Sequence, residues 1–223
     1  MTLIVAIDRS NTTDGRDVIE VLEKICNMVA GVKLGMPLLL KHDLNLLLNI
    51  RKICNNNIIL DLKLADIGDI MVETAELFKN YADSIIAHSF IGKKDGIDKL
   101  KNFLDKNNMK LILVGSMSHM GSEEIYDKEI NNIINIIKDV NPWGVVLPAT
   151  RPEIIRTFRS KIGNEIKILS PGIGYQGAKP GTALCYGADY EIVGRSIMNA
   201  PDPKEATKVI IYEQKRGMYE CKR

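Results

Sequence analysis

The sequence is poor in the residues that build disulfide frameworks, metal clusters and aromatic binding surfaces. Its four cysteines are widely scattered and lack C-x-x-C spacing, which predicts free thiols of a reducing compartment and argues against a zinc site. Three histidines are too few and too dispersed for a metal cluster or a Ser-His-Asp triad, so we expect no bound metal. A single tryptophan gives no support for a stacking surface. The cysteines are Cys26, Cys54, Cys185 and Cys221.

Long apolar runs and an excess of one charge are absent as well. No stretch approaches the roughly 18 consecutive apolar residues of a membrane helix. The apolar run that follows Met1 is too short for a signal peptide and has no basic leader. The net charge of +2 and the lack of an arginine- and aromatic-rich stripe argue against a nucleic-acid surface. We therefore expect a soluble cytoplasmic protein with no nucleic-acid or membrane partner.

What the sequence does contain is one repeated pattern, in which short runs rich in Ile, Val and Leu alternate with segments of helical spacing such as 14–29 and 37–53. Near-continuous apolar strands alternating with helices indicate a parallel sheet covered by helices. Eight such units predict an α/β protein, a (β/α)8 TIM barrel that forms one domain over residues 1–223. A doubly wound open sheet is the alternative, but it normally has a G-x-G-x-x-G turn after its first strand, which this chain lacks. The expected strands are Leu3–Asp8, Gly31–Gly35, Ile58–Leu64, Ser84–Phe90, Lys110–Ser116, Gly144–Ala149, Ile166–Gly172 and Tyr190–Arg195.

Polar residues stand at or near the carboxyl end of nearly every expected strand. A barrel of this kind forms its active site on that face. A polar group at one strand end means little, because the chain must leave the core somewhere, but groups at nearly every end predict a mouth that holds a polar ligand. These groups are Asp8, Lys33, Asp61, Lys63, His88, Ser118 and Arg195.

The third expected strand and the residues directly after it carry a D-x-K-x-x-D pattern, Asp61, Lys63 and Asp66, in otherwise apolar surroundings. Side chains two apart on a strand point to the same face, so Asp61 and Lys63 should emerge together. Burying charges is costly unless they are paired. The pattern therefore predicts either a structural ion pair or an active site that holds a charged lysine between two carboxylates.

Two glycine-bearing segments, Ser170–Gly177 and Val193–Ser196, come after the last two expected strands. Barrels commonly bind phosphate at this place through backbone N–H groups. Glycine allows a close approach of the backbone, and Arg195 supplies a fork that matches phosphate oxygens. The alternative is that the glycines only serve tight turns. The long polar segment 173–181 further predicts a lid over the ligand.

Together these motifs resemble the orotidine 5′-monophosphate decarboxylase family, which catalyses the last step of UMP synthesis. The matching segments run in the same order along essentially the whole chain, and the compact length resembles the archaeal or bacterial branch. The resemblance implies cofactor-free conversion of orotidine 5′-monophosphate to UMP by a homodimer. The segments are Asp8, Lys33, Asp61-x-Lys63-x-x-Asp66-Ile67, Met117-Ser118-His119, Ser170-Pro171-Gly172-Ile173-Gly174 with Gln176-Gly177, and Val193-Gly194-Arg195-Ser196.

The resemblance implies catalytic roles for four charged residues. Lys63 would stabilise the negative charge that develops on the pyrimidine carbon losing carbon dioxide, and would then protonate it. Asp61 would lie beside the departing carboxylate, and Asp66 would come from the partner subunit. Lys33 would tie into this charged array.

The resemblance also implies a set of substrate-binding residues. Asp8 and Lys33 would hold the ribose hydroxyls, and Ser118 would contact the pyrimidine edge. Gln176 would bridge base and phosphate in the closed lid, while Arg195 would bind the phosphate. The full set is Asp8, Lys33, Ile67, Ser118, Gln176, Gly194 and Arg195.

One position departs from the family pattern. Members commonly carry a threonine three residues after the motif's isoleucine, directed across the subunit interface towards the ribose. Ile70 stands there in this chain, so that hydroxyl contact is in doubt.

Two other functions compete with this interpretation. Magnesium-dependent sugar-phosphate decarboxylases and hexulose-phosphate synthases of the same superfamily share the triplet and the phosphate loops. They carry a glutamate where this chain has Lys33, and replacing a carboxylate ligand by an ammonium removes the metal site. The fold would also permit a non-catalytic phosphate-ligand binder, but such a protein has little reason to bury Lys63 among carboxylates that repel phosphate.

Overall fold

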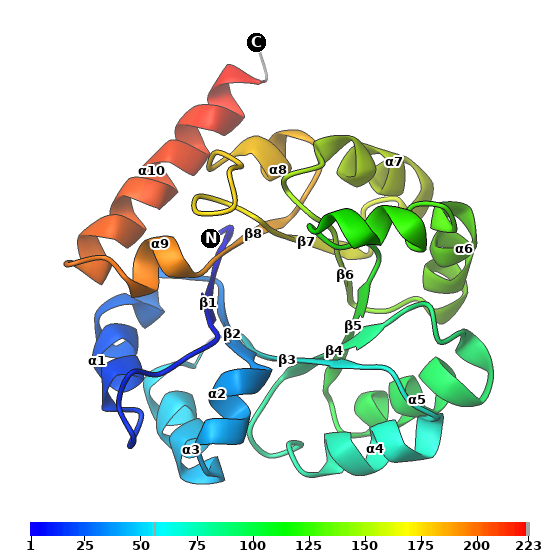
Figure 1. The fold of residues 1–223 in the computed structure, drawn as a ribbon, viewed down its shortest axis with the longest axis horizontal. Coiled ribbons are helices and arrows are strands. Elements are labelled where there is room, and N and C mark those ends of the chain that lie inside the picture. The colour runs from blue at the N-terminus through cyan, green and yellow to red at the C-terminus, as the bar shows by residue number, and fades with distance from the viewer. Residues whose placement is uncertain (56, 222–223) are drawn as a thin grey trace.

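The computed structural model of the chain describes residues 1–55 and 57–221. Its eight strands are all parallel and close into a barrel in the order β1 to β8, with β8 pairing back to β1. Figure 1 looks into this ring of strands. The predicted (β/α)8 barrel is therefore confirmed. The strands are β1 Leu3–Ile7, β2 Gly31–Gly35, β3 Asn57–Leu64, β4 Ser84–His88, β5 Lys110–Val114, β6 Gly144–Val146, β7 Lys167–Pro171 and β8 Tyr190–Val193.

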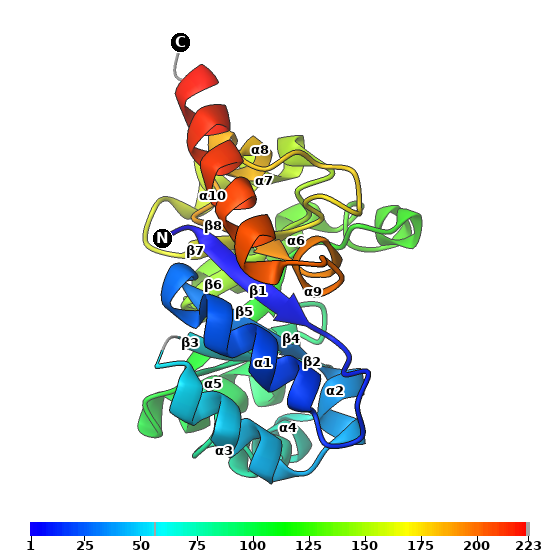
Figure 2. The ribbon, with the colours of Figure 1, turned by 90° about the vertical axis from the view of Figure 1, so that its left-hand side faces the viewer.

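The helices form an outer layer around the ring (Figures 1 and 2). No helix in the described part of the chain is long and apolar enough to cross a membrane. The helices are α1 Arg16–Ile25, α2 Met36–Lys41, α3 Leu44–Ile53, α4 Gly68–Glu76, α5 Asp98–Lys106, α6 Ile130–Val140, α7 Pro152–Ile162, α8 Thr182–Cys185, α9 Arg195–Met198 and α10 Pro203–Glu220. Single tighter or wider turns cover Cys26–Met28, Lys93–Ile97 and Met120–Glu124.

Burial of both faces of the strands explains their apolar sequences. Every residue of β1 and β2 is buried, because one face fills the barrel and the other meets the helices. Helix α1 presents Val18, Leu22 and Ile25 to the sheet at helical spacing, and all three are fully buried. Burying such a side chain stabilises the fold by about 1.5–3 kcal/mol.

The predicted helix over 37–53 is two helices in the structure. His42 and Asp43 have extended backbone between α2 and α3, and the Asp43 carboxylate accepts a hydrogen bond from the Asn45 N–H at 2.9 Å. Aspartate at this position satisfies an N–H group that the start of a helix leaves unpaired. The continuous helical spacing of leucines across both helices hid this break.

The four cysteines are paired in two disulfides, Cys26–Cys54 and Cys185–Cys221, so the prediction of free thiols was wrong. The paired Cα atoms lie 5.4 and 6.0 Å apart, within the span of a disulfide. The first bond joins the ends of α1 and α3, and the second joins α8 to the end of α10, which runs beside it (Figure 2). Sequence spacing could not reveal these pairs, because the folded helices bring them together.

Candidate active site

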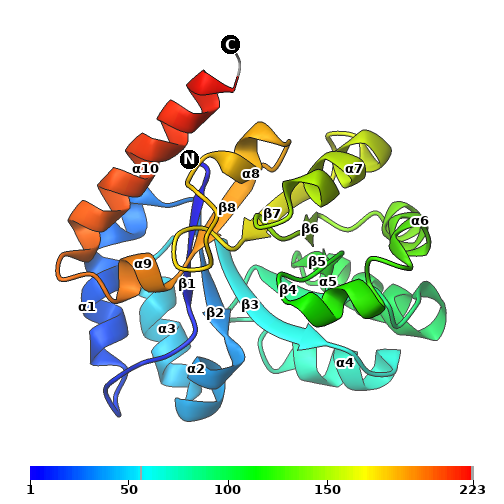
Figure 3. The same ribbon diagram turned by 45° about the horizontal axis from the view of Figure 1, so that its top comes forward.

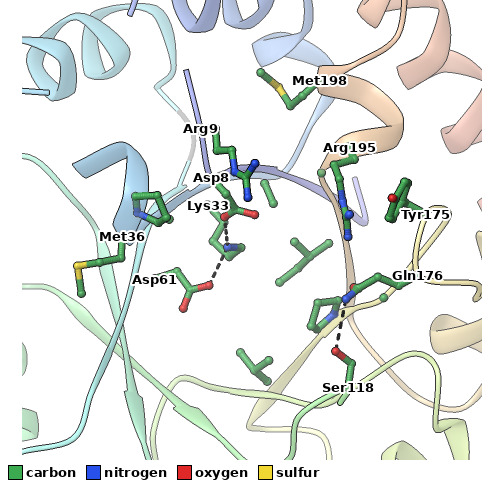
Figure 4. Close-up of a pocket in the computed structure, with 18 of the residues that line it drawn as sticks. Asp8, Arg9, Lys33, Met36, Asp61, Ser118, Tyr175, Gln176, Arg195 and Met198 are labelled. Atoms are coloured by element: carbon green, nitrogen blue, oxygen red, sulfur yellow. Dashed lines mark hydrogen bonds and ion pairs between the residues drawn. The ribbon is translucent and has the colours of Figure 1, made fainter. Parts of the chain in front are cut away.

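A cavity of about 1050 Å³ opens at the carboxyl ends of the strands. Its floor consists of inward-facing apolar side chains from the strands, and its walls come from the loops that follow them. In Figure 4 charged groups from β1, β2 and β3 occupy one side, and Arg195 and the loop after β7 occupy the other. The floor residues include Ala6, Ile86, Val114, Val146 and Ile192.

Four of the predicted residues form a continuous charged array in this cavity. The Lys33 ammonium lies 3.1 Å from Asp8 Oδ1 and 2.7 Å from Asp61 Oδ2. The other Asp61 oxygen accepts from the Lys63 ammonium at 2.7 Å. Charges alternate from Asp8 through Lys33 and Asp61 to Lys63, and Figure 4 shows the first three of these residues. Lys33 is not part of the D-x-K-x-x-D pattern in the sequence. In the structure it is the cation that joins Asp8 to Asp61 in the charged array.

Burial makes this array sensitive to its own charges. Lys33 and Asp61 are both buried. Burial alone would raise the pKa of Asp61, but the charges of Lys33 and Lys63 outweigh it and hold the pKa below its ordinary value. Burial likewise opposes the charge of Lys33, whereas Asp61 and Asp8 raise its pKa above the ordinary value. Both groups are therefore ionised at neutral pH.

The backbone at Lys63 departs from a regular strand. Its φ angle is +46°, which side chains other than glycine rarely adopt, and the pairing of β3 with β4 shifts register between Leu60 and Leu64. Asp61 and Lys63 share a face as predicted, but this irregularity, and not simple alternation, positions the lysine. Strained backbone of this kind clusters at functional sites.

Asp66 and Ile67 do not line the cavity of their own chain. Both are exposed in the loop between β3 and α4, where the Asp66 carboxylate accepts from the Ile67 N–H at 2.7 Å. In the described residues the Lys63 ammonium pairs with Asp61, and no ion pair joins it to Asp66 of the same chain, so one chain does not hold it between two carboxylates.

The opposite end of the cavity carries the expected phosphate-binding segments. Arg195 begins α9 directly after β8 (Figure 3), and Gly194 and Gly172 line the cavity beside it. Gly172 has a φ angle of +113° and Gly174 one of +74°, so side chains there would strain the backbone. In the described residues the Arg195 guanidinium has no carboxylate partner and remains available to an anion.

The segment 173–181, which was predicted to be a lid, contributes Ile173, Tyr175 and Gln176 to the lining of the cavity. Within this segment, the Gly174 N–H donates to the Ala178 carbonyl at 2.8 Å, and the Gly177 N–H donates to the Gly174 carbonyl at 2.8 Å. Gln176 reaches across to the loop after β5, where its Nε2 lies 3.4 Å from Ser118 Oγ (Figure 4). The structure thus brings together two residues that are 58 positions apart in the sequence.

His88 lies at the end of β4 but does not line the cavity. Its Nδ1 hydrogen-bonds the Tyr126 hydroxyl, and its ring packs on Phe90. Burial lowers the pKa of His88, and the positive charge of Lys63 lowers it further. A neutral imidazole that hydrogen-bonds outside the cavity points to a structural role, so the prediction that His88 belongs to the polar mouth was wrong.

Several cavity residues were not predicted from the sequence. Arg9 and Asn11 follow β1 and line the cavity. Their closeness to Asp8 in the sequence was the signal that could have identified them. Tyr175 precedes Gln176 in the lid, and Met36 and Met198 add apolar wall. Methionine and tyrosine carry no distinctive motif, so only the tertiary structure identifies them.

A partly buried network beside the loop of Ser118 was also not predicted. Arg151 donates to the Asp127 carboxylate, to the Met117 carbonyl and, at 2.9 Å, to Ser116 Oγ. Ser116 Oγ in turn donates to Asp127 at 2.9 Å. These bonds fix the loop that carries Ser118.

The chain is similar to known proteins in both sequence and fold. A sequence model described as "Orotidine 5'-phosphate decarboxylase / HUMPS family" matches residues 1–210. An orotidine 5'-phosphate decarboxylase of Sulfurisphaera tokodaii is 48% identical over 203 residues, which cover 91% of this chain and 92% of that protein. The enzyme of the same name from Aeropyrum pernix is 42% identical over 209 residues, covering 92% and 85%.

Solved structures give the same result. Orotidine 5'-monophosphate decarboxylase from Sulfolobus solfataricus superposes with a TM-score of 0.85 at 38% identity, covering 97% of this chain and 98% of that one. The Methanocaldococcus jannaschii enzyme complexed with the inhibitor BMP has a TM-score of 0.86 at 30% identity, covering 95% and 98%. The similarity extends over the whole barrel and includes the segments that form the cavity.

Proposed function

The chain belongs to the orotidine 5'-phosphate decarboxylase / HUMPS family, and from this premise we propose that it converts orotidine 5′-monophosphate to UMP, as a carboxy-lyase of pyrimidine biosynthesis. The observation that carries the proposal is the alternating array of Asp8, Lys33, Asp61 and Lys63 in one cavity with Arg195. A nucleotide places a reacting base and a phosphate at two separate points, and the cavity offers charge at both.

The array supplies what decarboxylation without an organic cofactor requires. When the bond between the ring carbon and the carboxylate breaks, carbon dioxide leaves and the electron pair stays on carbon. Fixed positive charge in a site that excludes water is the main available stabiliser of that pair. Lys63 provides the charge and then transfers its proton to the carbon, which yields UMP. Asp61 orients Lys63 and lies beside the departing carboxylate.

Lys33 favours this reaction over the magnesium-dependent chemistry of related enzymes. Its ammonium lies between Asp8 and Asp61, where a cation would otherwise have to bind. The proposed reaction uses the side chains of the protein alone, because the Lys33 ammonium replaces a carboxylate ligand that a magnesium site needs.

The remaining cavity groups bind the substrate. Asp8 and Lys33 hold the ribose hydroxyls, and Ser118 meets the edge of the base. Gln176 spans from the base to the phosphate when the lid is closed. The phosphate binds to Arg195 and to the backbone at Gly194, where the missing side chain allows a close approach.

We further propose a homodimer in which Asp66 and Ile67 complete the partner's site. Support comes from their exposure outside their own cavity and from the exposed apolar side chains of Ile70, on α4, and Phe90, which follows β4. Contiguous exposed apolar surface marks interaction sites. With Ile70 in place of a hydroxyl-bearing residue, this contact is apolar, and the ribose is held by Asp8 and Lys33.

Complementation of two inactive variants tests the shared site. Mixed K63A and D66N subunits form a heterodimer with one doubly altered site and one intact site. Random exchange should then restore roughly a quarter of wild-type activity, because half of the dimers are mixed and each has one good site. If Asp66 acts within its own chain, mixing restores nothing.

We also place the protein in the cytoplasm, where nucleotides are made and used. The two disulfides do not oppose this, because intracellular proteins of some hyperthermophilic archaea are rich in disulfides, and the relatives named above are archaeal.

The direct test mixes EDTA-treated protein with orotidine 5′-monophosphate and follows the ultraviolet change as the carboxylate is lost. Rapid conversion to UMP in the presence of EDTA is the expected result. Absence of conversion by a folded sample would refute the proposal and direct attention to sugar phosphates with magnesium.

A further inference from the structure

The lid residue Tyr175 contacts Arg195, the residue that is proposed to bind the phosphate. The guanidinium carbon of Arg195 lies 3.5 Å from the centroid of the Tyr175 ring. No hydrogen bond or ion pair holds the Arg195 side chain elsewhere in residues 1–55 and 57–221, so the ring is its defined support. Figure 4 shows the ring beside Arg195, on the side away from Asp8 and Lys33.

The exposure of Tyr175 is difficult to explain by packing. The residue is 69% exposed and lies outside the hydrophobic core. A large ring held in solvent contributes little to the stability of the barrel. Its contact with a cation in the cavity is therefore the physical reason for its position.

A ring face suits the task of holding an arginine ready for phosphate. Stacking occupies the flat face of the guanidinium and leaves its edge, with the N–H donors, free to bind two oxygens at once. A carboxylate would also hold the arginine, but it would neutralise the charge and repel the phosphate. The aromatic ring attracts the cation through its quadrupole without competing for the N–H groups.

The lid fixes the ring through its own compact turn. The Gly174–Ala178 and Gly177–Gly174 backbone bonds enclose Tyr175, while its neighbour Gln176 contacts Ser118. One short turn thus carries two adjacent side chains, one directed to the phosphate end and one to the loop beside the base. The turn that contacts Ser118 is therefore the same turn that places the ring against Arg195.

We propose that Tyr175 is a positioning residue that holds the Arg195 guanidinium in place for the phosphate of the nucleotide. This inference rests on the proposed function, because it needs a phosphate-bearing ligand in the cavity. It assigns Tyr175 no contact with the reacting atoms. Its effect should appear in binding of the phosphate and leave the chemical step unchanged.

The test compares Tyr175→Leu, which removes the ring, with Tyr175→Phe, which keeps it. Tyr175→Leu should raise the KM for orotidine 5′-monophosphate roughly three- to thirtyfold at unchanged kcat, the range expected from loss of a cation–π contact. Tyr175→Phe should stay within about twofold of wild type, because the ring face and not the hydroxyl supports the arginine. Tyr212→Leu, at an equally exposed tyrosine on α10, is the matched control.

Two further comparisons separate positioning from a general effect on the lid. In an Arg195→Ala background, Tyr175→Leu should cause no additional loss, since coupled residues are not additive. Affinity for UMP, measured by calorimetry, should fall in Tyr175→Leu, while affinity for uridine should not. Three results would each overturn the inference. Tyr175→Leu could lower the affinity for uridine as much as that for UMP, or could cause its full loss in the Arg195→Ala background. Tyr175→Phe could also be as impaired as Tyr175→Leu. If the wild-type protein binds UMP but does not decarboxylate orotidine 5′-monophosphate, the proposed function is refuted. The comparison of UMP with uridine then still decides the role of Tyr175.

Discussion

Replacing Lys63 by alanine removes the ammonium that lies 2.7 Å from Asp61 and faces the active-site cavity. The side chain of Lys63 is 39% exposed, so it contributes little buried surface to the fold. Asp61 keeps its second ion pair with Lys33 at 2.7 Å, so the substitution does not leave a buried carboxylate unpaired. The variant should therefore fold, and the loss should appear in the reaction itself.

The expected loss can be estimated from two separate roles. A unit charge about 4 Å from the developing carbanion, at an effective dielectric constant of about 20, stabilises it by about 4 kcal/mol. That energy corresponds to roughly a thousandfold in rate. Loss of a positioned proton donor costs a further factor of about 10² to 10⁴. We expect kcat/KM of Lys63→Ala to fall by roughly 10⁵ to 10⁷.

The assay follows decarboxylation by ultraviolet absorbance, and calorimetry measures UMP affinity in parallel. UMP binding should change by less than about tenfold, because the product lacks the charge that Lys63 stabilises. Lys101→Ala, at a surface lysine paired with Asp105, is the control and should retain full activity. Turnover by Lys63→Ala within tenfold of wild type would refute the electrostatic account.

Three other predictions concern stability. Lys33→Met removes one of the two cations that Asp61 contacts, while the 2.7 Å pair with Lys63 remains, so the free energy of unfolding should fall by about 1–3 kcal/mol in urea titrations at pH 7. Because the pKa of Lys33 is raised, the stability it contributes is present below pH 10.5 and is lost as the pH rises through its folded value. An unchanged titration would contradict the pairing. Reducing the disulfide between Cys185 and Cys221, which are 36 positions apart, should cost at most about 4 kcal/mol, or a fall in Tm of roughly 8–16 °C, and the double serine variant should match the reduced protein. A Tm indifferent to reductant would argue against the bond. The pKa of His88 lies below its ordinary 6.5, so the stability from its neutral form is present above pH 6.5 and is lost as the pH falls. The free energy of unfolding measured from pH 8 to 5 should show this loss in the wild type. In His88→Asn the dependence of that free energy on pH should be weaker.

The sequence was informative wherever a local pattern corresponds to a burial pattern. All eight strands were found, and β2 has the predicted bounds Gly31–Gly35, because strands buried on both faces must be apolar throughout. Parallel closure places the carboxyl ends of strands on one face, so most of the polar residues at those ends lie in one cavity, although His88 does not. Asp8, Lys33, Asp61 and Lys63 were therefore found as a group before their contacts were known.

Sequence patterns gave the wrong prediction where the backbone is irregular but the spacing of apolar residues continues without a break. The apolar spacing from Pro37 to Ile53 continues through the break between α2 and α3, so the sequence concealed it. The sequence likewise gives no sign of the positive φ angle of Lys63, because lysine has no preference for that backbone conformation. In both places the surrounding fold selects a backbone that the residue types do not require.

The sequence by itself determined the barrel, the face that carries the site and the residue types available for chemistry, because these follow from burial and strand order. Only the tertiary structure decided which of those residues touch. It paired the cysteines, put Lys33 between two carboxylates, left Asp66 outside its own cavity and stacked Tyr175 on Arg195. Such contacts join positions far apart along the chain, and they depend on how barrel closure orients each loop, which no local period encodes.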